Sequence, residues 1–132
     1  MYKITSLIIL LTVLVSCNTN AQNSANAQKV LVSAQAFQDS IKLDTAPVVL
    51  DVRTEQEFQG GHLKGAININ YYGDNFLALC KQYDTSKPVY VYCHSGGRSA
   101  GAANKLQKAG FVNIIELKGG ITSWKAANLP LE

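Results

Sequence analysis

The stretch VYVYCHSGGRS, residues 89–99, decides how this chain should fold. Its first four residues predict a buried strand, and residues 99–109 predict a helix that Ser99 can cap. The glycine-rich segment between them places Cys93 at the carboxyl end of a strand and before a helix. Ligands of parallel α/β sheets bind at this edge, where backbone N–H groups and the helix dipole favour anions and thiolates. The sequence therefore predicts a nucleophilic thiolate within an anion-binding loop.

Strand and helix signals alternate along the whole of residues 29–132. The expected strands cover residues 29–32, 48–50, 66–70, 88–92 and 112–117, and the expected helices cover residues 34–42, 55–59, 74–83, 99–109 and a short segment around Trp124. This alternation predicts an α/β fold, a doubly wound parallel sheet flanked by helices on both faces. About a hundred residues suffice for one domain with its own core.

The first 28 residues have a different character. Lys3 precedes an apolar run that is too short to span a bilayer comfortably, and residues 14–17 (LVSC) resemble a bacterial lipobox. We expect a lipoprotein signal peptide over residues 1–16 with lipid attached to Cys17. Residues 18–28 contain neither a charge nor a large apolar side chain, so residues 17–28 should form a lipidated, flexible tether. An ordinary secretory signal with an incidental cysteine is the alternative.

These features predict a protein of the bacterial cell envelope, lipid-anchored on a periplasmic or surface face. Without Lys3, 11 of the 12 basic side chains remain against 9 acidic ones. No basic run with interleaved aromatic residues is present, so the sequence does not support nucleic-acid binding.

Of the cysteines after Cys17, Cys93 lies in the loop and Cys80 falls on the apolar stripe of an expected helix. We expect Cys80 to be a core residue. A disulfide with Cys93, or a role as its resolving thiol, stays open at this point and requires Cα atoms within about 7 Å of each other.

The loop after Cys93 has the composition of an anion site. Gly96–Gly97 lets backbone N–H groups point inward at a thiolate, and Arg98 adds a permanent positive charge. His94 is either an assistant in catalysis or an outward-facing neighbour. If Cys93 were only a buried structural residue, this Gly-Gly-Arg loop would have no purpose.

Four segments, in order, resemble motifs of the rhodanese (sulfurtransferase) domain family. They are VVLDVR at 48–53, EFQGGHLKGAINI at 57–69, VYCHSGGRS at 91–99, and LKGGI at 117–121 followed by Trp124. The resemblance covers almost all of residues 29–132, with one small and conservative departure at Leu63.

The resemblance implies that Cys93 takes sulfane sulfur from a small anionic donor such as thiosulfate and holds it as a persulfide. The sulfur would pass to cyanide, a thiol or a protein acceptor, without a metal or an organic cofactor. Cys93 and Arg98 would be catalytic, and the substrate-binding residues would be His94, Ser95, Gly96, Gly97, Arg98 and Ser99. Structural roles near the site are expected for Asp51, Arg53 and His62.

Two other functions stay open at this point. Cell-cycle-type dual-specificity phosphatases and some arsenate reductases use a similar Cys–Arg loop, but with five residues between the two. Here four residues, 94–97, intervene, and the smaller cradle suits one sulfur better than a tetrahedral phosphate. A non-enzymatic sulfur carrier or binding module is the second alternative, and the presence of both Cys93 and Arg98 disfavours it.

Overall fold

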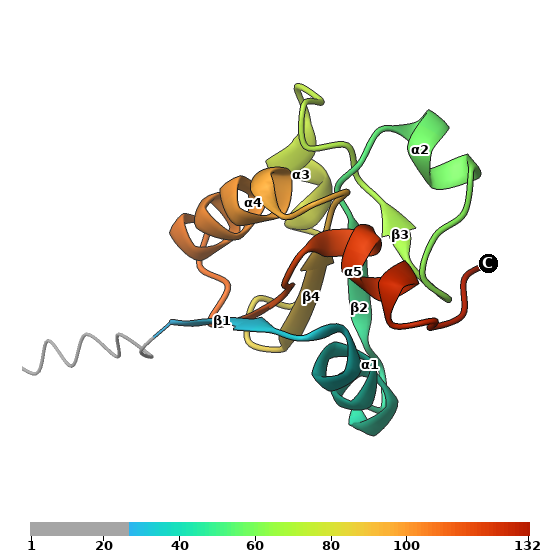
Figure 1. Cartoon of the computed structure of the whole chain (residues 1–132). Helices are drawn as coiled ribbons and strands as arrows, with labels where there is room; N and C mark the ends of the chain where they lie inside the picture. Colours follow the sequence, from blue (N-terminus) through green and yellow to red (C-terminus); the bar gives the residue numbers. More distant parts are fainter. Residues whose placement is uncertain (1–26) are drawn as a thin grey trace, which may run out of the picture.

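The computed structural model describes residues 27–132 as one parallel sheet with helices on both faces (Figure 1). Its elements are β1 (Gln28–Val32), α1 (Ala34–Leu43), β2 (Val48–Asp51), α2 (Glu55–Gln59), β3 (Ile67–Asn68), α3 (Phe76–Cys80), β4 (Pro88–Tyr92), α4 (Gly97–Lys108), β5 (Asn113–Leu117) and α5 (Gly120–Ala126). The five strands lie in the order β1-β5-β4-β2-β3. The predicted fold class is confirmed. The expected signal peptide, Cys17 and the tether up to residue 26 lie outside the described residues.

Each face of the sheet has its own apolar core. Helices α1 and α5 cover one face, where Phe37 meets the rings of Tyr90 and Trp124 edge-on, with centroids 5.6 and 6.4 Å away. Helices α3 and α4 cover the other face, over a cluster that includes Phe76 and Leu106. Helix α2 buries no side chain. No helix in the described part of the chain is long and apolar enough to cross a membrane.

The central position of β4 explains why its sequence is almost continuously apolar. It pairs with β2 on one side and β5 on the other, and its side chains alternate between the two cores. A strand buried on both faces needs apolar side chains at every position. The register sets Tyr92 beside Asp51, so Cys93 emerges at the carboxyl edge of the sheet next to the end of β2.

The start of α4 differs from the sequence prediction in a way that affects the site. The helix begins at Gly97, and its N-cap is Gly96, whose φ of 116° lies in the left-handed region. The prediction that Ser99 caps this helix is therefore wrong. Ser99 lies inside the first turn, fully buried, with its hydroxyl donating to the carbonyl of Gly96 and lying 3.6 Å from the sulfur of Cys93.

Two other elements are shorter than their sequence patterns suggest. Strand β3 is reduced to Ile67–Asn68 because its register matches it only to Leu50 and Asp51, the last two residues of β2. Helix α3 begins at Phe76 because the preceding residues form tight turns, in which the N–H of Gly73 donates to the carbonyl of Asn70. The N–H of Tyr71 donates to the carbonyl of Val52, so the segment between β3 and α3 begins beside the carboxyl end of β2.

A buried polar cluster joins the ends of β2 and β4. The Asp51 carboxylate accepts hydrogen bonds from the Arg53 Nη2 at 2.6 Å and from the Tyr92 hydroxyl at 2.5 Å. Arg53 also donates to the carbonyl of Gly61, and the Tyr92 oxygen accepts from the N–H of Leu63. Burial and the neighbouring Asp51 charge raise the pKa of Tyr92 far above its ordinary value, so its hydroxyl stays a donor. The cluster ties three segments together directly beneath Cys93.

Replacing Asp51 by Ala should destabilise the domain strongly. The change leaves the Arg53 guanidinium buried without its counter-ion, which costs about 3–5 kcal/mol in comparable cases. Tyr92→Phe should cost less, about 1–3 kcal/mol, because it leaves one buried N–H, that of Leu63, without its partner. Urea unfolding followed by Trp124 fluorescence measures both, and equal losses for the two variants would contradict this division of roles.

Candidate active site at Cys93

Cys93 directly follows β4, and its thiol is almost completely buried, at 1% exposure. The Sγ accepts a hydrogen bond from the N–H of Gly96 at 3.1 Å. It also donates to the Ser99 Oγ at 3.6 Å, while the Ser99 hydroxyl donates to the carbonyl of Gly96 at 3.0 Å. Once the thiol has lost its proton, this hydroxyl can turn and donate to the sulfur instead. The backbone N–H groups of Ser95 and Ser99 also lower the pKa of this thiol. The loop and the first turn of α4 thus form a ring of donors around one atom.

Two opposing effects act on the pKa of the Cys93 thiol. Burial raises it, because a buried thiolate loses its hydration. The hydrogen bonds from the Ser99 hydroxyl and from the backbone N–H groups lower it by more, so the pKa lies below its ordinary value. Cys80 provides the contrast, since burial without such donors raises the pKa of its thiol to about 11. Both thiols are free, and Cys93 is the one prepared as a nucleophile.

The loop is also held from its outer side, by the N-terminus of α5. The N–H of Ile121 donates to the carbonyl of Cys93 at 2.9 Å. The N–H and the hydroxyl of Thr122 both donate to the carbonyl of His94, at 3.1 and 3.0 Å. This approach requires glycine at position 120, because a Cβ there would lie 2.5 Å from both carbonyl oxygens.

The hydrogen bonds from α5 orient the backbone N–H groups of the loop around the sulfur. In a trans peptide the C=O and the following N–H point to opposite sides. Because Thr122 holds the His94 carbonyl, the N–H of Ser95 points to the opposite side of the peptide, where it contributes to the lowered pKa of Cys93. Thr122 is therefore a positioning residue for the thiolate cradle. Nothing in the sequence marks this threonine, because its contact depends on how closely α5 approaches the loop.

Arg98 is paired rather than free. Its guanidinium makes two parallel hydrogen bonds to the Glu57 carboxylate, at 2.7 and 2.8 Å. The same carboxylate accepts from the Thr54 N–H at 3.0 Å as part of the capping box of α2. The hydrogen bond from Arg98 lowers the pKa of Glu57 to about 2. Sequence reasoning found the arginine but missed its partner, which lies 41 residues away.

The remaining predicted residues lie around this centre. The side chains of His94 and Ser95 are exposed, and Gly97 opens α4. Asp51 and Arg53 form the buried cluster described above. The ring of His62 stacks on Phe58 with centroids 3.8 Å apart, and its Nδ1 lies 3.1 Å from the Phe58 carbonyl oxygen. The backbone N–H and C=O of His62 also pair with Glu132, at 2.9 and 2.8 Å, so His62 contacts both α2 and the segment around Glu132, and none of these contacts is with Cys93.

Comparison with known proteins decides the family. A family model described as "Rhodanese-like domain" matches residues 33–127. The chain belongs to this family. Its relatives include the thiosulfate sulfurtransferase GlpE of Shewanella oneidensis, 35% identical over 80 residues, which cover 61% of this chain and 77% of that protein. The uncharacterised protein YqhL of Bacillus subtilis is 44% identical over 80 residues, 58% of this chain and 59% of that protein.

A solved structure supports the same assignment. The rhodanese-related protein from Thermoplasma volcanium superimposes with a TM-score of 0.66 at 33% identity, covering 76% of this chain and 95% of that one. The domain shares the fold of that protein over most of residues 27–132.

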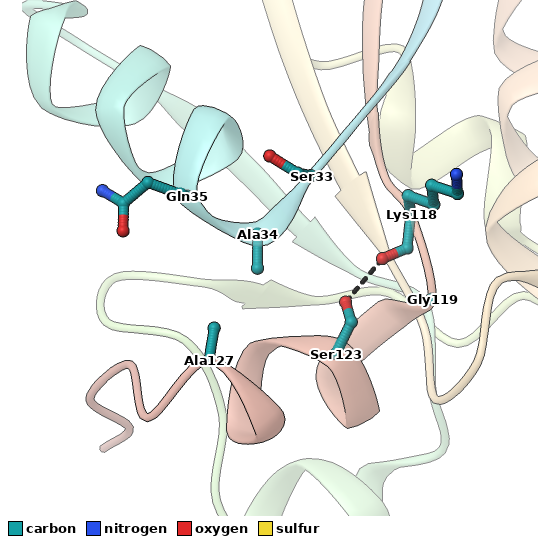
Figure 2. Close-up of a pocket in the computed structure, with 7 residues that line it drawn as sticks. All are labelled: Ser33, Ala34, Gln35, Lys118, Gly119, Ser123 and Ala127. Atoms are coloured by element: carbon teal, nitrogen blue, oxygen red, sulfur yellow. Dashed lines mark hydrogen bonds between the residues drawn. The ribbon is translucent and has the colours of Figure 1, made fainter.

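Other features of this rhodanese-like domain offer less chemistry. An open hollow of about 500 Å³ lies beside the start of α1. Figure 2 draws the residues that line it: Ser33, Ala34, Gln35, Lys118, Gly119, Ser123 and Ala127. Its two hydroxyls are already engaged: Ser33 accepts from the N–H of Ala36, and Ser123 donates to the Lys118 carbonyl. Within residues 27–132, no three His, Cys, Asp or Glu side chains are grouped to hold a metal ion.

Replacing Thr122 by Val should weaken the cradle of the rhodanese-like domain without unfolding it. The side chain keeps its shape but loses one hydrogen bond, worth about 1 kcal/mol, so alkylation of Cys93 at neutral pH should slow by up to about fivefold. The protonated thiol is unreactive, and the variant thiol should be more basic. The alkylation profile should therefore move to higher pH, and the two rates should converge at alkaline pH.

Thr122→Ser keeps the hydroxyl and serves as the matched control. It should retain the wild-type pH profile of alkylation. A rate difference between Thr122→Val and wild type that persists at alkaline pH would show that Thr122 controls access to the sulfur and not its ionisation.

Proposed function

We propose that this domain is a sulfurtransferase in which Cys93 carries sulfane sulfur from a small anionic donor to a nucleophilic acceptor. The observation that carries the proposal is the ring of hydrogen-bond donors around Sγ, which lowers the pKa of a buried thiol. The name of the Shewanella relative, thiosulfate sulfurtransferase, supports the same reaction class.

In the loading step the Cys93 thiolate attacks the outer sulfur of the donor. With thiosulfate, a new S–S bond forms to Sγ, and the S–S bond of the donor breaks with its electron pair leaving on sulfite. The products are the Cys93 persulfide anion and sulfite, so charge and electrons balance without a cofactor. The N–H groups of residues 95–99 are placed to stabilise the negative charge, which moves to the outer sulfur of the persulfide.

In the transfer step an acceptor attacks that outer sulfur. Cyanide would leave as thiocyanate, and a thiolate would leave as a new persulfide, while the electron pair of the broken bond returns to Sγ. The same donors that stabilised the thiolate at the start receive it again. Arg98 lies close enough to act on this charge too: the hydrogen bonds to Glu57 are the main cause of its raised pKa, and the Cys93 thiolate raises that pKa further by a smaller amount.

Treatment with thiosulfate should add one sulfur atom to the purified domain, removable by cyanide and detectable by mass spectrometry. Cys93→Ser should abolish this gain completely. Cys80→Ala is the control, because Cys80 is a core thiol with a raised pKa and should not carry the sulfur. Loading that survives in Cys93→Ser would overturn the proposal.

The competing functions give different results in the same preparation. Hydrolysis of an aryl phosphate that depends on Cys93, without any sulfur loading, would establish the phosphatase-like alternative. A binding module would show neither activity, and Cys93→Ser would leave its partner binding intact.

We infer further that the domain works at the bacterial cell envelope, anchored by lipid on Cys17. Support comes from the short apolar run of residues 4–15 and the LVSC segment that ends at Cys17. Cells fed a labelled fatty acid should incorporate the label into the full chain and not into Cys17→Ala. Label in both proteins, or in neither, would contradict the anchor.

A further inference from the structure

The mouth of the Cys93 site is electrically balanced. Arg98 brings a positive charge to the loop, and Glu57 pairs with it through two hydrogen bonds of 2.7 and 2.8 Å. Both side chains are partly buried, at 17% and 31% exposure. The pair is therefore less screened by solvent than an ordinary surface ion pair.

Contacts within α2 hold the Glu57 side chain in the conformation that reaches Arg98. Its Oε2 accepts from the N–H and from the hydroxyl of Thr54, at 3.0 and 2.9 Å, as well as from Arg98. The capping box thus restrains the carboxylate independently of its contact with Arg98. Helix α2, which buries no side chain, holds this carboxylate against the active-site loop.

The balance matters because the loading step brings anions together. The Cys93 thiolate carries one negative charge, and thiosulfate carries two. An unpaired Arg98 would attract the dianion twice as strongly as a monoanion, since the energy scales with the product of the charges. Glu57 cancels most of that attraction, and the sulfur then faces mainly neutral N–H and hydroxyl dipoles.

We propose that Glu57 is a specificity-determining residue, which biases the site toward donors with one negative charge, such as thiosulfonates and persulfides, over dianionic thiosulfate. This inference rests on the sulfurtransferase activity proposed above. Glu57 would distinguish sulfur donors by their charge and not by their shape.

Two donors isolate the charge. Methanethiosulfonate and thiosulfate both present a terminal sulfur on a sulfonyl group, and they leave as methanesulfinate and sulfite. Methanethiosulfonate has a methyl group where thiosulfate has a charged oxygen, so the first is a monoanion and the second a dianion. In a two-step reaction of this kind, kcat/KM for the donor reports the loading step alone, whichever acceptor is used.

Glu57→Gln is the test. Gln also serves in a capping box, so the variant should keep the N-terminal cap of α2 while it loses the carboxylate charge. The ratio of kcat/KM for thiosulfate over methanethiosulfonate should rise about threefold, the effect of one extra unit of donor charge at a partly screened distance. The rise should shrink as salt is added.

Glu55→Gln is the matched control. It removes the same charge from the same helix, but Glu55 is exposed and contacts Gln59 rather than Arg98. Its donor ratio should stay at the wild-type value. Arg98→Gln should lower the ratio, because Glu57 is then unbalanced, and the double variant Glu57→Gln/Arg98→Gln should restore it whatever its absolute rate.

The outcomes separate this inference from the proposed function. If the wild-type chain takes sulfur from neither donor, the proposed function fails. If it loads but Glu57→Gln changes both donors by one factor, or Glu55→Gln shifts the ratio equally, Glu57 does not set specificity and the inference is overturned.

Discussion

The site depends on the hydrogen bonds that the N-terminus of α5 donates to the carbonyls of Cys93 and His94. Those bonds decide the orientation of two peptide planes, and the planes decide which groups face the sulfur. The helix reaches the loop only because position 120 has no Cβ. Two helix N-termini thus meet at one cysteine: α4 follows the loop and supplies donors to the sulfur, while α5 clamps the loop from outside. The thiolate cradle is a property of packing between these helices and not of the loop alone.

This arrangement explains how a thiol can be buried and acidic together. Removing a thiolate from water is unfavourable, and Cys80 shows the result when nothing compensates. At Cys93 fixed dipoles replace the lost hydration, and they are in place before any charge forms. The buried Asp51–Arg53–Tyr92 cluster fixes the end of β4, and so the residue that directly precedes Cys93.

The sequence predicts well what depends on local pattern and poorly what depends on distance. Val48–Leu50 and the strand before Cys93 are predicted correctly because burial on both faces demands continuous apolar residues. The edge strand expected over 66–70 pairs over only two residues, because pairing is set by its neighbour and not by its own alternation. Ser99 was expected to cap α4, but the left-handed conformation of Gly96 starts the helix earlier, and no local propensity marks that choice. Glu57 and Thr122 lie far along the chain from the residues they serve, so only the folded structure identifies them.

The parallel sheet also gives the domain a direction. Every strand runs the same way, so β1 enters at the amino edge, whereas Cys93 lies at the carboxyl edge, after β4. The chain that precedes Gln28 therefore joins the domain at the end opposite the thiol. If Cys17 is held in a bilayer as we infer, the anchoring chain leaves from the end of the domain that is remote from the thiol, and an acceptor protein can reach Cys93 without meeting that chain.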